Sequence, residues 1–105
     1  MTVYRARVFG NVFAWDSETE QPRVLPPRLD LRNHSPTGFA WSYSGSGPAQ
    51  LALALLCDVL GDDERALRLY QRFKAQAIAT VPNGSKFEMT SDQVLKHVER
   101  LEKQA

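Results

Sequence analysis

The chain has 105 residues, a single cysteine and a formal net charge of +1 at pH 7. A chain of this length forms one domain, residues 1–105, and can bury a core without disulfides or metals. The lone cysteine excludes an internal disulfide, and the near-neutral charge excludes a global attraction to nucleic acid or to an anionic membrane. We find no signal peptide and no apolar run of membrane length, and therefore expect a cytoplasmic protein.

A β-hairpin is predicted over residues 3–15, because apolar and polar residues alternate on both sides of the turn signal Gly10-Asn11. In its first strand, the expected inward residues are Tyr4, Ala6 and Val8, and the expected outward residues are Arg5 and Arg7.

Two less regular segments follow the hairpin. Residues 16–23 are polar and predict an exposed loop. Residues 24–31 contain Pro26-Pro27, which cannot donate to a strand ladder, so they predict an edge strand or a strap across the sheet. Leu29 and Leu31 are expected to anchor its end.

The centre of the predicted fold lies in residues 39–60. Its first part is typical of a half-buried strand, because aromatic residues alternate there with small ones. The aromatic residues are Phe39, Trp41 and Tyr43.

A buried helix is predicted immediately after that strand. Pro48 suits the first helical position, with Ser46 or Gly47 as the N-cap. Residues 49–60 are apolar almost all round, which is typical of a helix in the core, and Gly61 ends the run.

Two amphipathic helices are predicted in the remaining chain. The first begins at Asp62 or Asp63, and the second covers residues 92–101 behind a capping box of Thr90 and Gln93. Their expected inward residues are Ala66, Leu69, Tyr70, Phe73 and Ala77 in the first, and Val94, Leu95, Val98 and Leu101 in the second.

These elements predict an α+β fold. A small antiparallel sheet of three or four strands, in the N-terminal half, packs on the buried central helix, and two further amphipathic helices complete the cover. Residues 86–89 predict one more short strand. The order of strands before helices argues against a doubly wound fold.

One stretch carries a specific pattern. The run SPTGF at residues 35–39 is followed by Trp41, Tyr43 and the run GSGPAQLALA at residues 45–54. This pattern resembles a family of short bacterial and phage proteins described as a domain of unknown function, whose members share an S-P-T-G-F-x-W-G-Y-x-G-S-G-P-A-Q-L-A-L-A run. Ser42 departs from it, because the family usually has glycine there. The resemblance implies a small stand-alone domain, often in mobile or phage genomes, and implies no activity.

The loop before the central helix is the candidate site for a small anionic ligand such as a nucleotide. A helix N-terminus offers free N–H groups and a positive dipole end, and glycines let a phosphate approach. The candidate contacts are Gly45, Ser46, Gly47, Ala49 and Gln50, with His34 and Thr37 from the preceding turn. The alternative is that the glycines only form a tight turn, because the dinucleotide fingerprint is incomplete and a Walker lysine is lacking.

Neither a catalytic site nor a metal site is predicted, and we expect no cofactor. Ser44, Ser46, His34 and Asp30 are the parts of a hydrolase, but turn hydroxyls that cap backbone groups are the simpler interpretation without a nucleophile elbow. His34 and His97, the two histidines, match no metal-ligand spacing.

Nucleic acid is disfavoured as a partner. Clustered cations can contact phosphates, and the candidates are Arg65, Arg68 and Arg72 on one helix and Arg5 and Arg7 on the first strand. Acidic residues 62–64 lie beside the helix arginines, so a solvated face with compensated charge is the commoner interpretation.

The favoured function is a non-enzymatic interaction module of bacterial or phage origin, such as an accessory or counter-defence factor. Trp41 and Tyr43 are the candidate contacts with a protein partner, because Trp and Tyr anchor interfaces. Trp15 and the Pro-Pro strap are further candidates. The alternative is that the tryptophans lie in the core, and the alternative function is the small-ligand site at residues 45–50.

Overall fold

The computed structural model describes residues 1–104 of the chain. In chain order its elements are β1 (Thr2–Ala6), β2 (Phe13–Asp16), β3 (Arg23–Val24), α1 (Ser46–Leu60), α2 (Asp63–Phe73), the π-helical segment η1 (Lys74–Ile78), β4 (Phe87–Thr90) and α3 (Ser91–Lys103). This α+β architecture confirms the predicted fold class. Within residues 1–104, none of the helices has the length and apolar character needed to cross a membrane.

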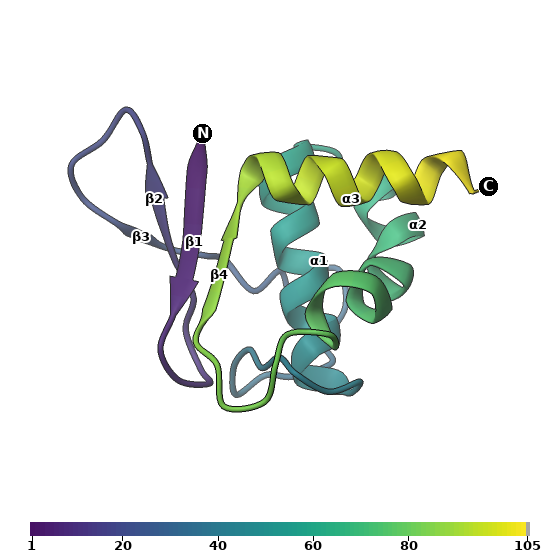
Figure 1. The fold of residues 1–105 in the computed structure, drawn as a ribbon, viewed down its shortest axis with the longest axis horizontal. Helices are drawn as coiled ribbons and strands as arrows, with labels where there is room; N and C mark the ends of the chain where they lie inside the picture. The colour runs from purple at the N-terminus through teal and green to yellow at the C-terminus, as the bar shows by residue number, and fades with distance from the viewer. Residues whose placement is uncertain (105) are drawn as a thin grey trace.

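The four strands form one antiparallel sheet in the order β3-β2-β1-β4. Three of them come from the N-terminal half, and β4 is the short strand predicted near residues 86–89. It reaches the sheet from the far end of the sequence and pairs Met89 with Tyr4. Figure 1 shows the sheet as one layer and the helices together on one side of it, with α3 running across the top.

The sheet alternates as predicted in β1, where Tyr4 and Ala6 are buried and Arg5 is exposed. The prediction for Val8 is wrong, because its side chain is 73% exposed. The strand ends at Ala6, so the alternation no longer determines which residues face the core two positions later. Arg7 is exposed as predicted.

The segment after β3 is a strap, and one of its two predicted anchors is wrong. Leu29 is 36% exposed, whereas Leu31 is partly buried and packs against the core, and Leu25 is fully buried. Leu25 still pairs with the hairpin, because its N–H donates to the carbonyl oxygen of Val12 at 2.8 Å. Arg28 then adopts a φ of 58°, which turns the chain away from the core before Leu29.

The predicted strand over residues 39–44 is also wrong. Phe39, Ala40 and Trp41 are all buried in succession, so the two-residue period does not describe this segment. Ser42 has a φ of 76°, in the left-handed region, which breaks an extended chain. Its N–H donates instead to the carbonyl oxygen of Ile78, at 3.1 Å.

Helix α1 is the core helix that the sequence predicts. Residues 47–57 are all buried, and Gly61 ends the helix with a φ of 62°. The predicted start is wrong by two residues, because Gly45 is the N-cap and Pro48 occupies the third helical position. Proline fits there equally well, since first-turn N–H groups have no intrahelical acceptor.

Helices α2 and α3 cover α1 on the side away from the sheet and along its end. Asp62 caps α2 as predicted, and the capping box of Thr90 and Gln93 opens α3. The predicted inward residues are buried with one exception: Leu95 is 45% exposed, and that prediction is wrong. The confirmed residues are Ala66, Leu69, Tyr70, Phe73, Ala77, Val94, Val98 and Leu101.

Candidate functional site

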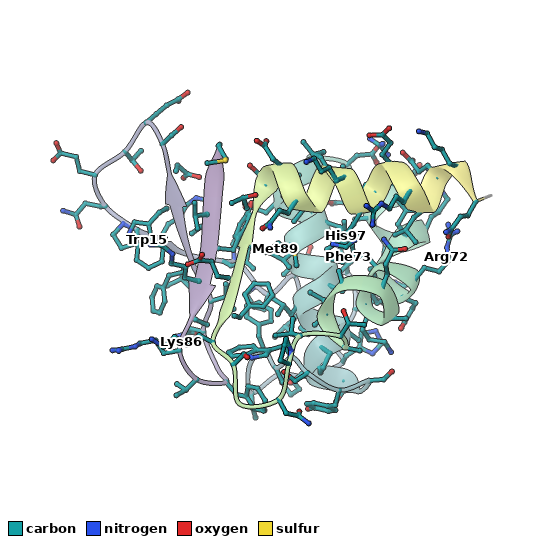
Figure 2. The ribbon with its side chains drawn as sticks, viewed as in Figure 1. Trp15, Arg72, Phe73, Lys86, Met89 and His97 are labelled. Atoms are coloured by element: carbon teal, nitrogen blue, oxygen red, sulfur yellow. The ribbon has the colours of Figure 1, made fainter. Side chains whose placement is uncertain are left out.

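The side of the sheet that points away from the helices is uncovered. Figure 2 shows Trp15 and Lys86 projecting from it, on the side opposite α1. Strand pairing sets Phe13 opposite Arg5 and Arg5 opposite Glu88, which makes a row across three strands. We call this surface the open face and define it by Arg5, Arg7, Phe13, Trp15, Lys86 and Glu88.

A groove of about 690 Å³ lies on the open face. Besides the residues of that face, it is lined by Ala6, Val8, Asn11 and Phe87. Its volume falls within the roughly 300–1,000 Å³ of small-molecule sites. Its walls are too exposed to enclose such a molecule, because Phe13 is 38% and Val8 73% exposed. The groove is therefore suited to a partner that lies across it.

The side chain of Arg5 contacts two other side chains of the groove, those of Trp15 and Glu88. The Arg5 guanidinium carbon lies 5.7 Å from the centroid of the Trp15 ring, a cation–π contact. The Arg5 Nε atom lies 2.7 Å from Glu88 Oε1. Both partners of this ion pair are more than half exposed, so it adds less than about 1 kcal/mol to stability. In this arrangement Arg5 contacts Glu88 through Nε while its guanidinium lies over the Trp15 ring.

Two positive charges on the open face are uncompensated. Arg7 and Lys86 lie one residue beyond the paired residues Ala6 and Phe87. Among the described residues 1–104, neither forms an ion pair. The open face thus combines an exposed aromatic ring, Phe13, and a partly buried one, Trp15, with a positive end.

A polar network fixes the strands beneath this surface. The Arg23 guanidinium bridges Asp16 and Asp58, with Nε 2.7 Å from Asp16 Oδ2 and Nη1 2.9 Å from Asp58 Oδ1. The Tyr4 hydroxyl donates to Asp58 Oδ2 at 2.5 Å, and burial followed by this bond raises the pKa of Tyr4. The Arg23 guanidinium, followed by the Thr2 hydroxyl, lowers the pKa of Asp16 to about 2. The network ties β1, β2 and β3 to α1.

A second pocket, of about 360 Å³, lies at the N-terminus of α1. Thr37, Ser46 and Gly47 line it, so the structure brings together three of the residues predicted to bind an anion. Tyr43 lines the same pocket and is 48% exposed. Gly47 is required for packing, since a Cβ atom there would lie 2.7 Å from that of Ala40.

Gln50, another predicted ligand contact, is fully buried and bonds within the protein. Its Oε1 atom accepts from the backbone N–H groups of His34 and Ser35, at 2.8 and 3.1 Å. Its Nε2 atom donates to the carbonyl oxygens of Pro27 and Arg32, at 2.6 and 3.0 Å. These bonds use the donors and acceptor sites of the amide, so Gln50 connects the strap and the turn to α1.

The other predicted contacts lie beside the pocket without lining it. His34 points toward α2, where its Nε2 atom lies 2.8 Å from the Tyr70 hydroxyl. Ala49 is buried and its N–H donates to the carbonyl oxygen of Gly45, at 3.0 Å. Gly45 is the N-cap of α1.

Trp41, a predicted partner contact, lies in the core and is 2% exposed. Its Nε1 atom donates to the carbonyl oxygen of Ser85, at 2.8 Å, and its ring packs edge-on to Phe9 with centroids 4.9 Å apart. Sequence analysis missed Phe13 and Lys86 as surface partners of Arg5 and Arg7. The hairpin alternation could have placed Phe13 with Arg5, but nothing local indicates that β4 pairs with β1.

The thiol of Cys57 is unreactive at neutral pH. Burial raises the pKa of the Cys57 thiol to about 11, so at neutral pH it is protonated and a poor nucleophile. In the described part of the chain, residues 1–104, no three His, Cys, Asp or Glu side chains are grouped to hold a metal ion.

Comparisons with known proteins give one match. The model of a protein family, described as "Family of unknown function (DUF6166)", matches residues 5–100. No curated protein and no solved structure matches the chain.

Proposed function

The chain belongs to this family of unknown function, and we propose that it is a non-enzymatic interaction module whose open face binds a partner protein. The observation that carries the proposal is the uncovered groove in which Phe13 and Trp15 lie beside Arg5. Trp and Arg are the residue types that contribute most to protein interfaces, and large apolar patches on monomers are often binding sites.

The order already present in the groove supports binding at low entropic cost. The Trp15 ring contacts the Arg5 guanidinium, and the centroid of the Phe13 ring lies 6.3 Å from that of Trp15. Immobilising a free side chain at an interface costs about 0.5–1.5 kcal/mol. Side chains that already contact one another lose less freedom on binding, so more of their contact energy appears as affinity.

The chemistry of the open face favours binding over catalysis. Its side chains are cations, aromatic rings and the single carboxylate of Glu88. Acyl transfer needs a nucleophile beside a free general base, and the carboxylate of Glu88 is instead paired with Arg5. We also propose a cytoplasmic setting, which the free thiol of Cys57 supports. The resemblance to short bacterial and phage proteins supports an accessory or counter-defence role.

Site-specific photo-crosslinking tests the proposal. Benzoylphenylalanine replaces Phe13 in the full chain, and the control carries it in place of Leu95, which is 45% exposed on α3. In a lysate of the organism that encodes the chain, we expect a discrete crosslinked protein from position 13 that disappears when Trp15→Ser is added. The same products from both positions, or none from position 13, would overturn the proposal.

A second candidate function is binding of a small anionic ligand at the N-terminus of α1. The specific observation is the pocket that Thr37, Ser46, Gly47 and Tyr43 share there. A thermal-shift screen against nucleotides and simple anions tests it, because a ligand at a hundredfold excess over Kd adds about 2.7 kcal/mol to stability. A saturable shift that Thr37→Val removes is the expected result, and a flat screen would refute binding of the compounds tested.

A further inference from the structure

The charge on the open face indicates what kind of segment it binds, if the proposed function holds. Arg5 is paired with Glu88, whereas Arg7 and Lys86 have no ion pair among residues 1–104. The uncompensated charge of the groove is therefore positive. Complementary charges set partner choice and orientation at interfaces, so the partner should be negative at this end of the groove.

The apolar floor of the groove favours a partner segment that carries an apolar side chain beside its negative charges. Phe13 and Val8 present exposed apolar surface, and the partly buried Trp15 ring already carries the Arg5 guanidinium. A large apolar side chain that covers Phe13 and Val8 would remove this surface from water, at about 25 cal/mol per Å². A purely acidic segment would leave it exposed.

A second copy of this chain fits the face poorly. In a two-fold symmetric contact each open face would meet its own equivalent. The cations Arg7 and Lys86 of one copy would therefore need carboxylates on the open face of the other copy. The one carboxylate that defines this face, Glu88, is already paired with Arg5, so the face does not complement its own charge.

Single-stranded nucleic acid is also less well matched. Its binding sites combine stacking aromatics with a cationic groove that follows the phosphates. Here the Trp15 ring is occupied by Arg5, the carboxylate of Glu88 lies at the β4 end of the row, close to Lys86 in sequence, and the chain as a whole has a formal charge of +1.

We infer that the open face binds an acidic, apolar peptide segment of a partner protein. A large apolar side chain of that segment lies against Phe13 and Val8. Its carboxylates lie near Arg7 and Lys86. This inference rests on the proposed function and adds the chemistry of the partner to it.

Selection from a phage-displayed library of random linear peptides tests the inference, with the full chain immobilised. We expect enriched peptides to carry Asp or Glu next to Trp, Phe or Leu. The double variant Arg7→Glu/Lys86→Glu should bind synthetic copies of these peptides with an affinity lower by about tenfold or more, which corresponds to about 1.4 kcal/mol. The control Arg32→Glu/Arg68→Glu has the same change in net charge at exposed cations outside the groove, and it should leave affinity within about twofold.

Each other outcome is decisive. Selected peptides whose binding needs Trp15 but which are neutral or basic would overturn the inference of an acidic segment. So would peptides whose affinity is unchanged in the Arg7→Glu/Lys86→Glu variant. Either result would leave the proposed function standing. Selection without any binder that depends on Phe13 or Trp15 would count against both. Tighter binding of an oligothymidylate strand at the open face would assign nucleic acid instead. Sedimentation as a dimer that Trp15→Ser dissociates would assign a second copy.

Discussion

Replacing Gln50 by methionine tests whether this buried amide is structural. Methionine keeps the length and volume of the side chain but cannot make the bonds to His34, Ser35, Pro27 and Arg32. The segment that loses them leads from the strap into α1, so we expect Gln50→Met to destabilise the whole domain.

The magnitude follows from the number of bonds. Each intramolecular hydrogen bond contributes a net of about 1 kcal/mol, so losing these four removes up to about 4 kcal/mol. Pro27 and Arg32 are exposed, and water can replace part of their bonding, which sets the lower end at about 2 kcal/mol. At about 4–8 °C per kcal/mol for a small domain, a loss of about 2–4 kcal/mol lowers Tm by roughly 8–32 °C.

Urea unfolding and thermal melts of the purified full chain measure this change. Gln71→Met is the matched control, because Gln71 is exposed on α2 and its replacement should stay within about 0.5 kcal/mol. A free energy of unfolding for Gln50→Met within about 0.5 kcal/mol of the wild type would refute the structural role. If Gln50 instead served an anionic ligand, the variant would lose that ligand's thermal shift while remaining as stable as the wild type.

Further predictions concern backbone strain, pH and helix capping. Because Ser42 has a φ of 76°, Ser42→Gly should be more stable than Ser42→Ala by about 1 kcal/mol in urea unfolding. The pKa of Asp16 is lowered from 3.8 to about 2, chiefly by Arg23, so its contribution to stability is complete above the unfolded pKa and is lost as pH falls toward 2. Asp16→Asn should therefore reduce the free energy of unfolding at neutral pH, with a difference that shrinks under acid. Thr90→Ala should destabilise by about 1 kcal/mol through loss of the α3 capping box, as measured by thermal melts.

Each of these predictions has a contrary result. The strain argument fails if the alanine variant at position 42 equals or exceeds the glycine variant in stability. An Asp16→Asn difference that is independent of pH would mean that the carboxylate titrates alike in the folded and unfolded chain. For the capping box, Gln93→Glu is the control, because glutamate keeps the side-chain oxygen that accepts from the Thr90 N–H. A loss of stability from Gln93→Glu equal to that from Thr90→Ala would contradict the account.

Local patterns were sufficient to predict the helices, because the residues that cap and pack them are close in sequence. Asp62 and Thr90 cap α2 and α3 as expected, and Gly61 ends α1. The hairpin followed equally from its alternation. The caps lie within a few residues of the helices they begin or end, and the paired strands of the hairpin are consecutive in the chain, so sequence reasoning is strongest for these elements.

The errors arise where distant segments determine the local conformation. Ser42 adopts its left-handed conformation while bonding to Ile78 and Pro82, far along the chain, so the aromatic alternation around it did not yield a strand. Glycine is the residue that such a φ favours. The candidate site shows the same limit, since Lys86 joins Arg7 only through the pairing of β4 with β1.

The most direct test of the central claim compares the two candidate sites with one partner. The protein crosslinked at position 13 is purified and titrated calorimetrically into the wild type, Trp15→Ser and Thr37→Val. If the partner binds at the open face, its affinity should fall by about tenfold or more for Trp15→Ser and should change by less than about twofold for Thr37→Val. The reverse order would contradict the account and would place binding at the N-terminus of α1.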